Sequence, residues 1–141
     1  MEEMESSRAV IDTDILIDLL KGKEQARILV NKLEKENYVF CTTVVNVYEL
    51  YYGIHKTGQK KKRLQSTEKL LRNLSILPLT PRSAQKAGQV FAALEAEGQS
   101  IGLGDVFISA ITLTKGFSLL TRNIVHFRKI EGLSIISPET T

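Results

Sequence analysis

Short apolar runs alternate with amphipathic segments along most of this chain. Apolar runs of three or four residues predict buried strands, whereas apolar residues spaced three and four apart predict helices. Strands that alternate with helices are typical of α/β folds with a parallel sheet. We therefore predict an α/β fold in which a central, mainly parallel sheet of four to five strands is flanked by helices.

The predicted strands are short and the predicted helices are longer. Strands are predicted over residues 9–11, 38–41, 75–77, 118–121 and 133–136. Helices are predicted over residues 14–21, 24–36, 44–55, 59–73, 82–97 and 105–115, with a helical turn over 123–128. Thr43 suits an N-cap, Pro81 suits a helix start, and Gly98 suits a helix end.

Composition is that of an ordinary globular domain. The chain has 141 residues, of which 43% are hydrophobic and 25% charged, enough to bury a core without disulfides. Its single cysteine, Cys41, cannot form an internal disulfide, and two histidines are too few to complete a zinc cluster with it. No signal-peptide pattern and no apolar run of about 20 residues is visible, so we expect a cytoplasmic protein.

Positive charge is concentrated in one segment. Residues 56–72 hold seven Lys or Arg and one Glu, so this segment has a net charge of +6. The net charge of the whole chain is +3, so the remaining residues together carry −3. Such a segment suggests contact with a polyanion. A solvated helix face explains the same pattern equally well, and both interpretations stay open.

Polar side chains occupy the junctions between predicted strands and helices. Asp12 directly follows a strand, Asp14 lies in the first turn of the next helix, Asp105 opens a helix, and Asn123 follows another strand. Ligands bind at the carboxyl ends of the strands in open α/β sheets. Each Asp alone is explained as well by a helix cap. Together these residues predict one acidic site.

Glu49 is predicted to lie on a largely apolar stripe of its helix. Val45 and Tyr52 share that stripe, and no Lys or Arg lies within one turn. Burying an unpaired carboxylate is costly unless a cation compensates it. Gly53, one turn further on, would let another element approach closely. The alternative is that Glu49 is exposed because the helix face is misjudged.

Clustered carboxylates indicate divalent-cation chemistry. They repel one another and are tolerated mainly when a cation neutralises them, and oxygen ligands favour Mg²⁺ or Mn²⁺ over zinc. Such a cation can lower the pKa of a bound water and hold a phosphate oxygen, as phosphodiester hydrolysis requires. His55 and His126 are isolated in the sequence, and we assign both to surface or packing roles.

Four segments resemble the motifs of PIN domains, in order and in spacing. Residues 10–18 resemble the first motif, 43–53 the second, 104–110 the third and 120–127 the fourth. Together they cover nearly the whole chain. The likeness is greatest to the VapC toxins of VapBC toxin–antitoxin systems.

The resemblance implies a PIN-like three-layer fold in one domain, residues 1–141, with residues 1–7 as an N-terminal tail. It implies a Mg²⁺- or Mn²⁺-dependent endoribonuclease that forms a homodimer and is inhibited by a cognate VapB-like antitoxin. With RNA as the substrate, the basic run Lys60, Lys61, Lys62 and Arg63 becomes a candidate RNA contact. Charge reversal at the three lysines is then expected to weaken RNA binding and its salt dependence.

The resemblance also assigns roles to individual residues. Asp12, Glu49 and Asp105 correspond to the core acidic triad, with Asp12 and Asp105 as the metal ligands. Asn123 takes a fourth catalytic position that is often aspartate in PIN nucleases. Asp14 and Thr121 are supporting residues. His126 stands where many relatives carry another acid, and we give it no catalytic role.

Two other functions remain as alternatives. A PIN-like adaptor without catalysis would bind RNA or protein through the same fold, and metal binding would distinguish it from a nuclease. A haloacid-dehalogenase-type phosphatase would use Asp12 as nucleophile and Asp14 as general acid, because residues 10–15 fit its opening motif. We rank the phosphatase well below the nuclease because it leaves Glu49 without a role.

Overall fold

The computed structural model describes residues 7–58 and 60–138. Its strands are β1 (Ser7–Ile11), β2 (Tyr38–Thr43), β3 (Ser75–Leu77), β4 (Ser118–Leu120) and β5 (Ser134–Ile136). Its helices are α1 (Thr13–Leu20), α2 (Glu24–Lys35), α3 (Val44–Lys56), α4 (Lys60–Arg72), α5 (Pro81–Ala96), α6 (Leu103–Lys115) and α7 (Ile124–Phe127). All the predicted elements are present. Residues 1–6 of the predicted tail lie outside the described residues, whereas Ser7 already belongs to β1.

The five strands form one parallel sheet in the order β3-β2-β1-β4-β5. The chain builds outward from β1 to β3 on one side and then crosses to β4 and β5 on the other. The order therefore reverses between β1 and β4. In open parallel sheets, this switch point leaves a crevice at the carboxyl ends of the two strands.

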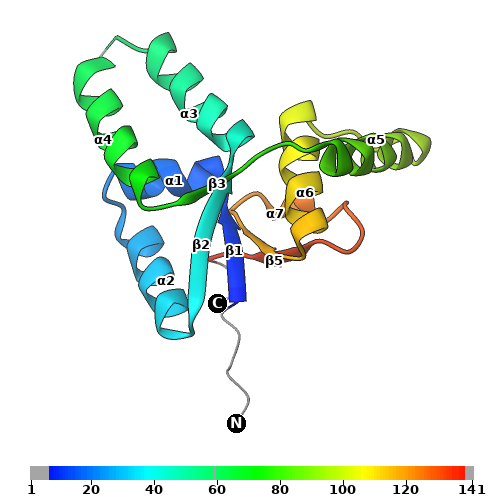
Figure 1. Cartoon of the computed structure of the whole chain (residues 1–141), viewed down its shortest axis with the longest axis horizontal. Helices are drawn as coiled ribbons and strands as arrows, with labels where there is room; N and C mark the ends of the chain where they lie inside the picture. The colour runs from blue at the N-terminus through cyan, green and yellow to red at the C-terminus, as the bar shows by residue number, and fades with distance from the viewer. Residues whose placement is uncertain (1–6, 59, 139–141) are drawn as a thin grey trace.

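Successive residues of the central strands face opposite sides of the sheet. Val10 of β1 and Leu119 of β4 are buried in one core cluster with α5 and α6. Ile11 and Leu120, the next residue on each strand, are buried in the other with α1, α2 and α4. Figure 1 shows the helices on both sides of the sheet, with α3 above it. The predicted three-layer α/β fold is confirmed.

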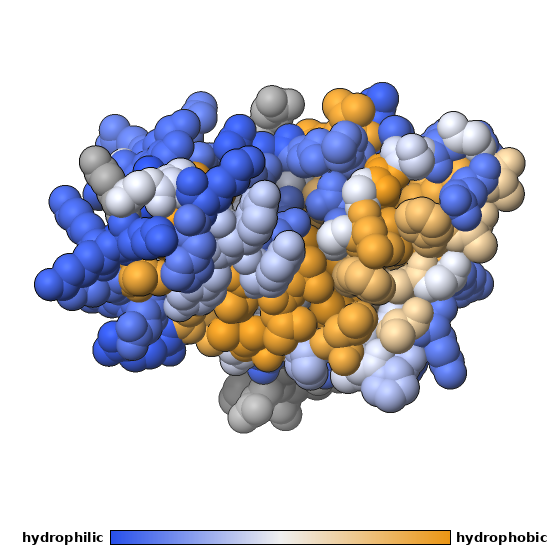
Figure 2. Space-filling view, turned by 90° about the horizontal axis from the view of Figure 1, so that it is seen from above, coloured by the Kyte–Doolittle hydropathy of each residue, from blue (hydrophilic) through white to orange (hydrophobic). Residues whose placement is uncertain are grey.

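The surface around α3 differs in polarity from one side to the other. Hydrophilic residues gather on the side where α4 lies, and hydrophobic residues gather in the middle of the same face (Figure 2). Val44, Tyr48 and Tyr52 of α3 and Leu103 of α6 are exposed, and the rings of Tyr48 and Tyr52 stack at 6.1 Å between centroids. Within the described residues, no helix has the length and apolar character needed to span a membrane.

Candidate active site

Asp12 lies at the switch point, directly after β1. It is only 6% exposed, and its backbone N–H donates to Leu120 O of β4 at 2.9 Å. Its Oδ2 accepts a hydrogen bond from Thr121 Oγ1 at 2.7 Å, and its Oδ1 accepts one from Thr13 N at 2.9 Å. Asp12 is thus also the N-cap of α1, so the helix-cap and acidic-site interpretations both apply to the same side chain.

Asn46 connects the start of α3 to this carboxylate. Thr43 caps α3, as predicted, and the Thr43 backbone N–H donates to Asn46 Oδ1 in a capping box. Asn46 is fully buried. Its Nδ2 donates to Asp12 Oδ1 at 3.1 Å and to Thr13 Oγ1 at 2.9 Å. The cap of one helix therefore orients the acid at the start of another.

Glu49 reaches the same region from α3. It is half-buried, and its Oε1 accepts a hydrogen bond from Thr13 Oγ1 at 2.5 Å. A Cβ at Gly104 would come within 3.0 Å of Glu49 Oε2, whereas a Cβ at Gly53 would meet nothing within 4 Å. The prediction that Gly53 permits a close approach was wrong. Gly104 does so, because α6 crosses α3 at that point.

Asp105 and Asn123 meet through His126. His126 Nδ1 lies 3.3 Å from Asp105 Oδ2 and 3.0 Å from Asn123 Nδ2. This nitrogen donates to the carboxylate when it carries a proton and accepts from the amide when it does not. His126 is isolated in the sequence and was assigned a surface or packing role, but α7 brings it beside α6, in contact with Asp105 and Asn123. His55, by contrast, is exposed as predicted.

Asp14 is tied to the turn that follows β4. Its Oδ2 accepts hydrogen bonds from Arg122 N at 3.0 Å and Thr121 Oγ1 at 3.4 Å. Its Oδ1 is buried and accepts no hydrogen bond within the described part of the chain. Thr121 Oγ1 also accepts from Asn123 N at 3.0 Å. Asp14 and Thr121 thus hold the turn against α1.

Burial is the main cause of the raised pKa values of Asp12 and Glu49. Burial raises the pKa of Asp12 to about 7; the charges of Asp14 and Asp105 act in the same direction, and the Thr121 hydrogen bond opposes them. Burial also raises the pKa of Glu49, with a further contribution from Asp105 and an opposing one from the Thr13 hydrogen bond. Asp105 therefore lies within electrostatic reach of both Asp12 and Glu49, and these three residues are here called the acidic site.

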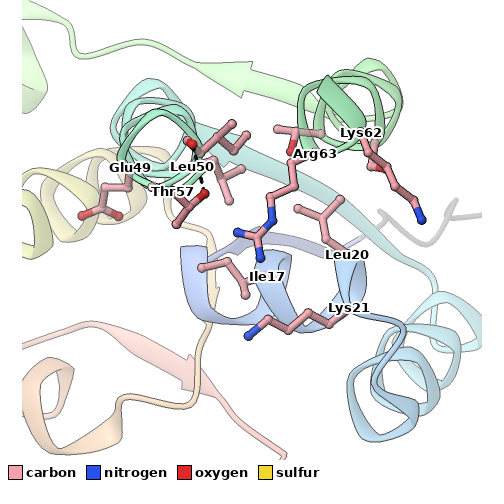
Figure 3. A pocket seen from close by; sticks show the side chains of 12 residues that line it. Ile17, Leu20, Lys21, Glu49, Leu50, Thr57, Lys62 and Arg63 are labelled. Carbon is pink, nitrogen blue, oxygen red and sulfur yellow. Dashed lines mark hydrogen bonds between the residues drawn. The ribbon is translucent and has the colours of Figure 1, made fainter. Parts of the chain in front are cut away.

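A groove of about 500 Å³ runs from Glu49 between α1, α3 and α4. Its walls are mainly apolar, with Ile17, Leu20 and Leu50 among them. Figure 3 shows Arg63 extending from α4 toward Ile17 while Lys62 points away. Of the four predicted RNA contacts, Lys62 and Arg63 line this groove, and Lys60 and Lys61 are exposed elsewhere on α4.

The donor set suits a hydrated divalent cation. Neither Asp12 nor Glu49 forms an ion pair within the described residues, so no cationic side chain compensates either carboxylate. Among those residues, no three His, Cys, Asp or Glu side chains are grouped closely enough to enclose a metal ion. Mg²⁺ is usually bound through only one or two carboxylates and keeps several waters. Asp12 and Asp105 fit that mode.

Comparison with known proteins decides the family. The PIN domain model matches residues 9–133. The chain belongs to the PIN domain family. This membership confirms the resemblance seen in the four motifs and sets aside the phosphatase interpretation.

Relatives and solved structures agree with this assignment. Ribonuclease VapC2 of Haemophilus influenzae is 27% identical over 124 residues, covering 88% of this chain and 92% of that protein. The tRNA(fMet)-specific endonuclease VapC of Shigella flexneri is 25% identical with the same coverage. A chain in the crystal structure of VapBC2 from Rickettsia felis bound to a promoter DNA fragment is 23% identical. The superposition covers 92% of this chain and 98% of the Rickettsia felis chain, with a TM-score of 0.86. This similarity confirms the PIN-like fold.

Several residues of the site were not predicted from the sequence. Thr13 and Asn46 contact Asp12 or Glu49, and Arg122 joins the turn to α1. The Thr43-x-x-Asn46 spacing was a readable signal, because a capping box pairs positions three apart. Nothing in the local pattern indicated that the Asn46 amide would also reach Asp12.

Proposed function

We propose that this chain is a Mg²⁺- or Mn²⁺-dependent endoribonuclease that acts in the cytoplasm as the toxin of a toxin–antitoxin pair. The observation that carries the proposal is Asp12, a buried carboxylate at the switch point that lacks a cationic partner within the described residues and lies within electrostatic reach of Asp105. The names of the VapC relatives support ribonuclease chemistry.

The chain's own residues would prepare the site for hydrolysis. Asp12 and Asp105 would hold the cation, and hydrogen bonds from Thr121 and Asn46 keep the Asp12 carboxylate in one orientation. Glu49 adds a third carboxylate, held by Thr13. When bound, the cation supplies a water of lowered pKa and a positive charge for a phosphate oxygen. Asn123 completes the site through its contact with His126.

The proposal includes three partners. RNA is the substrate, and Lys60, Lys61, Lys62 and Arg63 at the start of α4 supply positive charge beside the groove. A VapB-like antitoxin is supported by the VapBC complex to which the fold is similar. A homodimer is supported by the exposed apolar side chains of α3 and α6, and sedimentation analysis should give the mass of two chains.

The deciding experiment is cleavage of a mixed RNA pool with Mg²⁺ or Mn²⁺. The pool should contain a tRNA fraction because the Shigella relative is a tRNA(fMet)-specific endonuclease. We expect cleavage that requires metal and falls at least about a hundredfold in Asp12→Asn and Asp105→Asn. Glu68→Gln, which changes an exposed acid on α4, should cleave like the wild type. A wild type that neither cleaves nor binds metal by calorimetry would favour the adaptor.

A further inference from the structure

Arg122 is held in place at both ends. Its backbone N–H donates to Asp14 Oδ2 at 3.0 Å. Its guanidinium forms an ion pair with Asp18, with Nε 2.8 Å from Oδ2 and Nη2 3.4 Å from Oδ1. Asp14 and Asp18 are four residues apart, so both lie on the same face of α1. One helix face therefore anchors both the backbone and the side chain of this arginine.

The Asp18 carboxylate is buried, whereas the arginine is accessible. Asp18 is 6% exposed, and the Arg122 side chain is 51% exposed. Nη1 of Arg122 has no hydrogen bond or ion pair within residues 7–58 and 60–138. Lys23 Nζ lies 3.7 Å from Asp18 Oδ1, so two cations share this buried carboxylate and neither has it alone.

The Arg122 guanidinium lies near the acidic site. Thr121, the residue before Arg122, donates to Asp12. Asp18 follows Asp12 by six residues, about 9 Å along a helix that rises 1.5 Å per residue. The guanidinium is thus too far along α1 to contact a phosphate held at Asp12, and it is suited to a neighbouring phosphate of the same strand.

We propose that Arg122, held by Asp18, binds an RNA phosphate next to the scissile one. The inference rests on the proposed ribonuclease function and deepens it. A guanidinium presents paired donors that match phosphate oxygens, and an arginine already fixed by a carboxylate loses little side-chain entropy on binding. Carboxylates alone would repel the RNA strand, so a fixed cation beside them helps to hold it.

The test is the salt dependence of RNA binding by the full-length chain. Fluorescence anisotropy with a labelled single-stranded RNA, in chelator to prevent cleavage, would be measured between about 50 and 200 mM salt. Losing one phosphate contact should lower the slope of log affinity against log salt by about 0.7 in Arg122→Gln. Binding should weaken about threefold to tenfold. Arg122→Lys should keep the slope, because it keeps the charge.

Two further variants separate this role from a structural one. Arg27→Gln removes an arginine that pairs with Glu24 on α2, and it should leave the slope unchanged. Arg122→Gln leaves the buried Asp18 carboxylate with Lys23 as its remaining ion-pair partner. Combining it with Asp18→Asn removes that buried charge as well, and the double variant should lose the same slope as Arg122→Gln.

An Arg122→Gln slope equal to that of the wild type would overturn the inference, as would a fall in Mn²⁺ affinity without a change in slope. The second result would show that Arg122 only positions the metal ligands. A wild type that neither binds RNA here nor cleaves it with Mg²⁺ or Mn²⁺ would instead refute the proposed function, and the inference would fail with it.

Discussion

The two carboxylates proposed as metal ligands are held in different ways. Asp12 is buried and accepts hydrogen bonds from groups on three segments, namely Thr13 N, the Asn46 amide and Thr121 Oγ1. Asp105 is 22% exposed, and its carboxylate contacts His126. The fold therefore fixes the Asp12 carboxylate with three hydrogen bonds and leaves the Asp105 carboxylate more accessible and with fewer contacts. We therefore expect Asp12 to be the fixed anchor of the proposed cation site and Asp105 to adjust more readily.

Removing the support of Asp12 should have the largest effect. Asn46→Ala deletes a buried donor to Asp12 and half of the α3 capping box. We expect Mn²⁺ affinity to fall about 10- to 100-fold and stability to fall by about 2 kcal/mol. Calorimetry and chemical unfolding measure the two quantities.

Two matched variants sharpen that comparison. Asn73→Ala changes an exposed asparagine directly after the end of α4 and should alter neither quantity. His126→Ala removes the neighbour of Asp105 and should change Mn²⁺ affinity less than about threefold, since that ligand is already adjustable. Equal losses in Asn46→Ala and His126→Ala would contradict the difference between the two ligands.

The raised pKa of Asp12 predicts how stability depends on pH. Its folded-state pKa of about 7 lies above the ordinary value of 3.8, so the unfolded chain ionises first. Its contribution to stability is full below pH 3.8 and is lost as the pH rises through about 7. In chelator, the wild type should lose about 2 kcal/mol between about pH 5 and pH 8 relative to Asp12→Asn.

Thermal or chemical unfolding of both proteins at the two pH values measures this loss. Other titrating groups cancel in the difference between the proteins. Mg²⁺ at the higher pH should restore part of the wild-type stability and none of the variant's. If the stability of the two proteins depended on pH in the same way, the folded structure would not raise the pKa of Asp12.

The smallest effect is expected where α6 approaches α3. Gly104→Ala places a methyl group 3.0 Å from Glu49 Oε2, and the carboxylate must shift by a few tenths of an ångström. Cleavage should fall about threefold to tenfold, since small misplacements of a catalytic group are costly. Gly88→Ala, on the exposed side of α5 with nothing within 4 Å, should cleave normally and gain about 0.5–1 kcal/mol. Normal cleavage by Gly104→Ala would show that the Glu49 carboxylate can shift without a loss of activity.

Much of the fold follows from local pattern. The apolar run at 9–11 is a strand because its residues face two cores, and the Thr43 and Pro81 helix starts follow from capping and proline geometry. Asp12, Glu49 and Asp105 could be chosen as site residues because carboxylates at strand ends and on an apolar stripe require an explanation.

Only the tertiary structure decided which groups meet. Strand order placed β4 beside β1, so that Thr121 reaches Asp12 across 109 residues. The packing of α3 on α6 made Gly104, rather than Gly53, the point of close approach. The position of α7 beside α6 placed His126 next to Asp105, and the turn after β4 placed Arg122 next to Asp18 of α1. Sequence by itself determined the elements and the chemistry they carry, because propensity and periodicity are local. The contacts between elements depend on strand order and helix packing, which no local pattern encodes.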